Sequence, residues 1–120
     1  MINVSPSGVR VFTEAITGTL RNLHLHTEAG ELTEHGYAPI PLVPSQWDNG
    51  VYPDQAWEFE AGPSVDVVGY YVTDSKGDLM LSELFTSVDK DGNRVETPMT
   101  IKNTGDRITV SLKFNLLGAS

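Results

Sequence analysis

The chain has 120 residues, a formal net charge of −8, eight basic side chains and no cysteine. This length predicts one domain, and the lack of cysteine excludes disulfides and thiolate chemistry. The acidic balance argues against a nucleic-acid surface, because phosphate binding needs clustered Lys and Arg. No apolar run is long enough to span a bilayer, and the N-terminal stretch lacks a signal pattern, so we expect no membrane partner.

The first 19 residues predict an N-terminal arm with a short strand. The stretch from Ser5 to Gly8 is typical of a loose segment, and Val9 and Val11 fit a strand. The TGT sequence at 17–19 consists of poor helix formers, which disfavours a helix here. We therefore divide the chain into an arm at 1–19 and a β domain at 20–120.

Residues 20–27 predict a strand with two different faces. Leu23 and Leu25 alternate with His24 and His26 along this segment. Successive strand side chains point to opposite faces of a sheet. The leucines are therefore expected on the core side, and the histidines on the opposite, wetter side.

The middle of the chain predicts short extended segments separated by turns. A polar loop at 28–36 leads to residues 37–43, where prolines allow only an edge strand or an extended rim. The DNG sequence at 48–50 predicts a turn. The alternating strand that follows it, at 55–60, turns Trp57 and Phe59 inward.

The second half predicts a hairpin and a final strand. Strands at 65–73 and 79–88 flank a five-residue loop at 74–78, with Gly77 where a positive φ is needed. A turn at 89–94 and a short strand at 97–102 follow. In the last strand polar residues alternate with apolar ones, which we expect to be buried: Ile108, Val110, Leu112, Phe114 and Leu116.

Roughly eight short strands at regular spacing are typical of an all-β fold. We expect a single antiparallel β-sandwich, jelly-roll-like, with a short N-terminal arm. The predicted core contains Trp57, Phe59 and the inward side of the last strand.

The sharpest candidate for chemistry is the group formed by His24, His26 and Glu31. Its spacing resembles the first half of the metal motif of cupins, which bind Fe, Mn or Zn inside a jelly roll. The second half of that motif is missing. Cupin ligands also face the barrel interior, whereas Leu23 and Leu25 claim the interior here. A small cupin-type metal-binding protein is an alternative, but we expect no metal at these histidines.

Other catalytic patterns are weak. Residues 89–93 (DKDGN) resemble the start of a calcium loop but fit a hairpin turn better. Glu58, Glu60 and Asp66 offer carboxylate pairs of the kind that glycoside hydrolysis uses. Neither a nucleophile elbow nor a phosphate loop occurs. The sequence therefore predicts no enzyme and no cofactor.

Several aromatic residues could line a sugar-binding surface. Adjacent strand residues face opposite ways, so one of Tyr70 and Tyr71 belongs to the core side, and the other is left for a surface or a partner. The set comprises Trp47, Tyr52, Trp57, Tyr70 and Tyr71.

A pattern of strand and turn residues across residues 20–116 resembles small structural proteins of tailed bacteriophages. The matching stretches are LHLHT at 23–27, GYAP at 36–39, Trp47, WEF at 57–59, GYYVTD at 69–74, GDLM at 77–80, ELF at 83–85 and NTGDRITV at 103–110. The chain departs from the pattern at Met80, where a tryptophan is frequent, at Ser111, where a proline-containing ending is frequent, and at a longer turn over 89–95.

The resemblance implies a virion component. The expected role is a capsid decoration or cement protein that binds the major capsid protein and neighbouring copies of itself, and stabilises the head. The implied location is the capsid surface, after synthesis in the cytoplasm of the host bacterium. A tail, baseplate or fibre component with receptor or sugar binding is the alternative.

Two segments are the candidates for partner contact, because they combine small or apolar residues with backbone groups that the domain is not expected to pair. They are the arm and the proline-rich rim, represented by Val4, Pro6, Pro39, Ile40, Pro41, Leu42 and Pro44.

Overall fold

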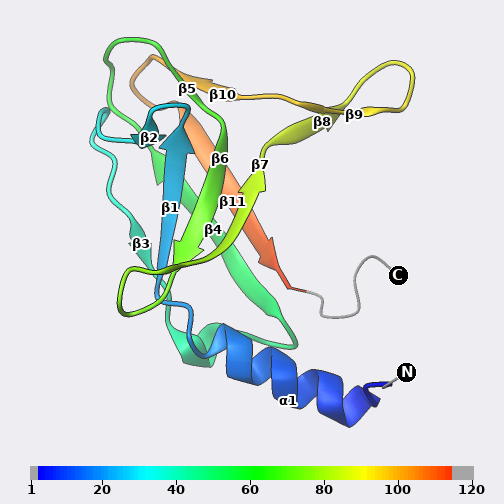
Figure 1. The fold of residues 1–120 in the computed structure, drawn as a ribbon. Helices are drawn as coiled ribbons and strands as arrows, with labels where there is room; N and C mark the ends of the chain where they lie inside the picture. Colours follow the sequence, from blue (N-terminus) through cyan, green and yellow to red (C-terminus); the bar gives the residue numbers. More distant parts are fainter. Residues whose placement is uncertain (1–2, 115–120) are drawn as a thin grey trace.

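The computed structural model describes residues 3–114 and shows an antiparallel all-β protein with one α-helix in that range (Figure 1). The all-β prediction is confirmed, and the finer jelly-roll topology stays a prediction. In chain order the elements are α1 (Pro6–Thr17), β1 (Asn22–Thr27), β2 (Gly30–Glu31), β3 (Ile40–Pro41), the 3-10 turn η1 (Pro44–Gln46), β4 (Val51–Glu58), β5 (Val65–Val67), β6 (Gly69–Thr73), β7 (Leu79–Leu84), β8 (Thr86–Val88), β9 (Arg94–Glu96), β10 (Met99–Ile101) and β11 (Arg107–Lys113).

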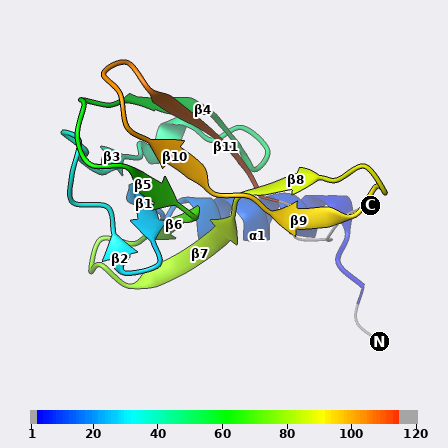
Figure 2. The ribbon, with the colours of Figure 1, turned by 90° about the horizontal axis from the view of Figure 1, so that it is seen from above.

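The strands form one larger sheet and three pairs. The larger sheet has the order β2-β1-β6-β7, and β3 also pairs with β1. The pairs are β4 with β11, β5 with β10, and β8 with β9. Seen from above, the β4–β11 pair lies opposite β1, β6 and β7, so the two groups make two layers (Figure 2).

The core lies between these layers. Strand β11 alternates strictly, with Ile108, Val110 and Leu112 each no more than 3% exposed. Leu23 and Leu25 of β1 are completely buried, as expected from their alternation with the histidines. Trp57 and Phe59 are buried too, whereas Phe114 is half-buried at the end of β11, so its predicted place in the core is wrong. Leu116 lies outside the described residues.

The predicted hairpin loop at 74–78 is confirmed in detail. The Asp74 carboxylate accepts hydrogen bonds from the backbone N–H of Lys76 and of Asp78, at 2.8 and 3.0 Å. Gly77 has φ +83°, which glycine adopts without steric cost. This loop sets the pairing of β6 with β7.

The N-terminal segment corrects the predicted arm and short strand, because residues 6–17 form a helix. Ser5 caps it through its side-chain oxygen, which accepts a hydrogen bond from the N–H of Gly8 at 3.0 Å, and Pro6 occupies the first turn. The buried side chains of the helix are Thr13 and Thr17, and the Thr13 methyl lies close to Gly50. The other residues expose much of the helix surface.

A second correction concerns the region after β7, where the expected strand at 79–88 breaks. Strand β8 pairs with β9, which was not predicted, and their hairpin projects from the two layers (Figure 2). The turn between them is closed by Asp89, which accepts hydrogen bonds from the N–H groups of Asp91 and Asn93, both at 2.9 Å. The DKDGN stretch is therefore a hairpin turn, as predicted.

The proline-rich rim is only partly the exposed surface that we expected. Leu42 is 4% exposed and belongs to the core, while Ile40 is half-buried and packs against it. Pro39, Pro41 and Pro44 are exposed. Segment β3 therefore covers the end of the core, and its prolines face outward.

His35 ties two loops together, a role that its place in a polar loop did not suggest. Its side chain is buried, and its backbone adopts the left-handed conformation with φ +62°. Its ring nitrogens lie 2.7 Å from the carbonyl oxygen of Glu60 and 2.8 Å from that of Pro63. The ring also lies so close to Gly62 that a Cβ there would be 2.9 Å from the ring carbon Cε1. The loop before β3 is thereby fixed to the loop after β4.

Candidate functional site

The outer face of the larger sheet gathers aromatic and ionisable side chains from three strands. In register, His24 of β1 stands opposite Tyr71 of β6, and Tyr71 stands opposite Ser82 of β7. The rings of His24 and Tyr71 are stacked, with centroids 4.5 Å apart, and His26 meets the Tyr71 ring edge-on at 5.9 Å. Of the two adjacent tyrosines, Tyr71 is therefore the surface residue, and Tyr70 packs against the core.

Glu31 connects this face through hydrogen bonds. Its Oε2 atom accepts from His24 Nδ1 at 2.6 Å and from the Tyr37 hydroxyl at 2.7 Å. The other ring nitrogen of His24, Nε2, lies 2.9 Å from the Thr73 hydroxyl, which can donate a hydrogen bond to it or accept one from it. These bonds fix the ring of His24, and through stacking they fix Tyr71.

The same contacts shift the pKa values of Glu31, Tyr37 and Tyr71. Burial works against ionisation of Glu31, but hydrogen bonds from His24 and Tyr37 outweigh it and lower the pKa of the carboxyl below its ordinary value. Burial, followed by the hydrogen bond to Glu31, raises the pKa of Tyr37. Burial and the Glu31 charge likewise raise the pKa of Tyr71. The face therefore presents one ionised carboxylate among neutral phenols.

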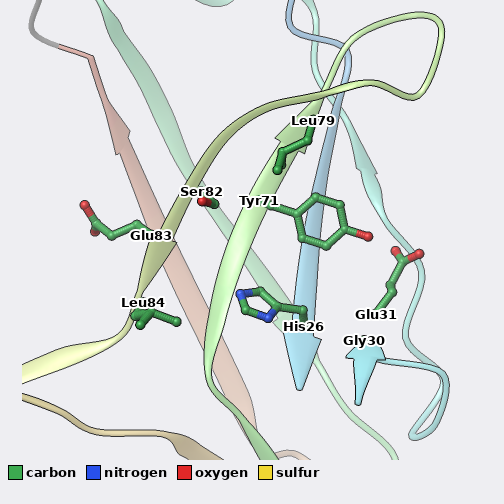
Figure 3. Close-up of a pocket in the computed structure, with 8 residues that line it drawn as sticks. All are labelled: His26, Gly30, Glu31, Tyr71, Leu79, Ser82, Glu83 and Leu84. Atoms are coloured by element: carbon green, nitrogen blue, oxygen red, sulfur yellow. The ribbon is translucent and has the colours of Figure 1, made fainter. Parts of the chain in front are cut away.

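An open groove of about 510 Å³ crosses this face from β2 to β7 (Figure 3). Leu79 and Leu84 are among its apolar residues, and the Glu83 side chain points away from the Tyr71 ring (Figure 3). The volume falls within the range of small-molecule sites, roughly 300–1,000 Å³. The complete lining is His26, Gly30, Glu31, Tyr71, Leu79, Ser82, Glu83 and Leu84.

Two small residues shape the groove and its border. Gly69 does not line the groove, but it leaves room for the His26 ring opposite it, because a Cβ there would clash with the Glu83 carbonyl oxygen and lie 2.9 Å from His26 Nε2. Ser82 stands beside Tyr71 on the side away from His24, and a hydroxymethyl group is too small to cover a phenol ring. One face of Tyr71 is thus stacked on His24, and the other opens into the groove.

Thr73, His24 and Glu31 line up as hydroxyl, imidazole and carboxylate, the order of a hydrolytic triad. The Thr73 side chain is buried at 6% exposure, and neither Thr73 nor His24 lines the groove. A substrate in the groove would meet Tyr71 instead of the hydroxyl. We therefore assign this row of groups the role of positioning Tyr71.

The residues of the candidate cupin-type site, at which we expect no metal, come together only in part. Glu31 binds His24, while His26 turns to the ring edge of Tyr71 and makes a long contact of 3.4 Å to the Thr27 carbonyl oxygen. Among residues 3–114, no cluster of three or more His, Cys, Asp or Glu side chains has the geometry to hold a metal ion.

Two of the three carboxylates considered for glycoside hydrolysis, Glu58 and Asp66, are engaged in separate places. Glu58 pairs with Arg107 at 3.3 Å on the outside of the β4–β11 pair, and Asp66 accepts from the Thr100 hydroxyl at 2.7 Å. The structure therefore does not combine them into one site.

The predicted partner-contact residues fall into two separate places. Val4 and Pro6 lie at the start of α1, and both are exposed. The proline-rich rim lies near the other end of the helix, because the N–H of Leu42 donates to the carbonyl oxygen of Arg21 just beyond α1. A 12-residue helix is about 18 Å long, so one small site cannot include both.

Sequence reasoning missed the groove because it depends on strand register. The pairings that place Ser82 beside Tyr71, and Tyr71 beside His24, join segments far apart in the chain. Only the opposite orientation of the adjacent tyrosines was a usable signal.

Comparison of the chain with protein-family models, curated proteins and solved structures gives no match. Within residues 3–114, no helix is both long and apolar enough to cross a membrane.

Proposed function

We propose that this protein is a structural component of a tailed-bacteriophage virion, and specifically a decoration or cement protein of the head. The observation that carries the proposal is apolar surface on the two elements that stand away from the core. On α1, Val11 is 61% and Phe12 51% exposed. On the β8–β9 hairpin, Val88 is 60% and Val95 41% exposed. Apolar surface on a projecting element is suited to contact with another protein.

The architecture supports the same role. A cement protein needs a stable β core that stays folded before assembly, and the two packed layers provide one. It also needs contacts that extend past its own body to neighbouring subunits, and the helix and hairpin extend in this way (Figures 1 and 2). The resemblance of the strand and turn pattern to phage structural proteins points in the same direction.

The proposed partners are the major capsid protein and neighbouring copies of this chain. A contact of a few apolar side chains is weak, but a shell offers the same site many times. Linked contacts act at high effective concentration, so modest energies per site suffice for stable decoration. No catalytic step and no cofactor belongs to this role.

Co-sedimentation with assembled empty shells tests the proposal. We expect the wild-type chain to sediment with shells and to bind isolated capsid subunits far more weakly. Val11→Asp and Val88→Asp should reduce binding by about tenfold or more, because each places a charge in an apolar contact. Ser75→Asp, in the exposed loop between β6 and β7, is the matched control and should bind as wild type.

Immunogold labelling of virions decides between head and tail. Labelling of the head, together with shell binding, supports the cement role. Labelling confined to tails, with no sedimentation on shells, replaces that role with the tail or fibre alternative. Equal shell binding by all three variants would reject the helix and hairpin as the contact.

A further inference from the structure

We propose that the groove on the outer face of the larger sheet binds a neutral sugar ring. The inference concerns the groove alone and does not depend on where the protein sits on a virion. Its basis is the open face of Tyr71, which is held by His24 on one side and is bare above Ser82 on the other. A rigid aromatic face of this kind is a stacking platform for a flat ligand with an apolar side.

The platform is fixed before any ligand arrives. Tyr71 stacks on His24, and His24 is held by hydrogen bonds to Glu31 and Thr73. Binding therefore orders few side chains, which keeps the entropic cost low. In this arrangement the hydrogen-bonded groups beneath the ring set the orientation of Tyr71 and take part in no reaction.

The polar groups around the platform select the chemistry of the ligand. Glu31 supplies acceptor oxygens, the hydroxyls of Ser82 and Tyr71 both donate and accept, and neutral imidazole at His26 offers one donor and one acceptor. Sugar hydroxyls also donate and accept, so they match such a mixed set. An ammonium or guanidinium group only donates, and it would leave the donors of Ser82 and His26 unused.

Two other ligand classes fit less well. A wholly apolar ligand would take the Glu31 carboxylate out of water without replacing its hydrogen bonds, which is costly. An anionic ligand would approach the Glu31 carboxylate, whose pKa is lowered, within a chain of net charge −8. A hydroxylated ring avoids both costs. Its apolar side can rest on Tyr71 and Leu84, and its edge can reach the polar rim.

Nuclear magnetic resonance titration of the full chain tests this inference. The probes are the methyl glycosides of glucose, galactose and mannose, together with N-acetylglucosamine. We expect at least one of them to move the amide signals of His26, Tyr71, Ser82 and Leu84 saturably, with a Kd of roughly 1–10 mM, as suits one ring in an open groove. Glucuronate, which adds a negative charge, should bind about tenfold or more weakly than the neutral glucoside.

A groove-filling variant and a matched control sharpen the test. Ser82→Tyr puts a ring against the open face of Tyr71 and should weaken binding about tenfold or more, without removing any contact of the fold. Thr109→Tyr introduces the same side chain on the exposed side of β11 and should bind as wild type.

Three outcomes would overturn the proposal. They are the absence of saturable shifts with all four neutral sugars, equal binding by Ser82→Tyr and wild type, and saturable binding of N-acetyl-arginine amide in the groove without sugar binding. The last result would make the groove a site for a cationic side chain. None of these results bears on shell binding, so the sugar site and the cement role fail or hold separately.

Discussion

At the scale of single residues, Glu31 shows how one carboxylate organises a surface. Two strong donors, His24 Nδ1 and the Tyr37 hydroxyl, meet at one of its oxygens. The sequence marked this glutamate as a possible metal ligand, because its distance from the histidines fits such a site. In the fold, Glu31 instead accepts a hydrogen bond from His24. Residue spacing therefore indicated which side chains meet, but not what they do when they meet.

The lowered pKa of Glu31 predicts how its contribution depends on pH. A carboxyl whose pKa is depressed by folding stabilises the protein above its ordinary value of 4.5, and this stabilisation is lost as the pH falls through the folded-state pKa. Glu31→Gln should therefore lower the free energy of unfolding at pH 7, and the difference from wild type should shrink at pH 3. Urea unfolding at the two pH values measures this.

Glu28→Gln is the control, because Glu28 is exposed in the loop between β1 and β2. It should change stability little at either pH. A Glu31→Gln penalty that is as large at pH 3 as at pH 7 would mean that the residue acts through packing, and that its charge contributes nothing.

At the scale of elements, β11 is the strand in which the alternation of the sequence agrees best with the observed burial. Its buried side chains alternate with exposed ones along the whole strand, and they face the core formed with β4. Leu112→Ala should cost about 2–5 kcal/mol in the free energy of unfolding, because a 3% exposed leucine leaves a cavity. Phe114→Ala should cost less, about 1–2 kcal/mol, since this side chain is only half-buried. Guanidinium unfolding of the two variants gives the comparison, and a larger loss at Phe114 would contradict the assigned burial.

The β8–β9 hairpin should open independently of the rest. Its strands pair with each other, and all six strand residues are exposed. Local opening of such an element needs little free energy, whereas β11 opens only with the core. Hydrogen exchange should therefore be roughly 100-fold or more faster at the Ser87 and Val95 amides than at Val110. Equal protection would show that the hairpin is held by contacts beyond its own pair.

Strands with a period of two and turns with a glycine or aspartate signal could be predicted from the sequence, and elements without such a local signal could not. The hairpin loop at 74–78 and the turn at 48–50 follow from local glycine and aspartate chemistry, so both were found. Helix α1 was missed because the poor helix formers at 17–19 outweighed Ser5 and Pro6, which together signal a helix start. Strand β9 was missed because a strand of three residues is too short for an alternation of polar and apolar side chains to be recognised. The groove required strand register, which no local pattern contains.

At the scale of the whole molecule, the shape departs from that of a compact domain. The radius of gyration is 16.1 Å and the principal extents are 50 × 39 × 23 Å. A compact chain of this length would have a radius of gyration of roughly 14 Å. The helix and the hairpin account for the elongation, because both extend from the two layers (Figures 1 and 2).

The projecting hairpin also separates two requirements, stable folding and contact with a partner, which act on the same residues in most protein surfaces. Its strand residues contribute nothing to the core, so substitutions at Val88 or Val95 should leave folding intact. Under the proposed role, selection on these two side chains comes from the neighbour that the hairpin contacts. A lineage could then exchange one partner for another by substitutions in this hairpin, while the β layers behind it stay unchanged.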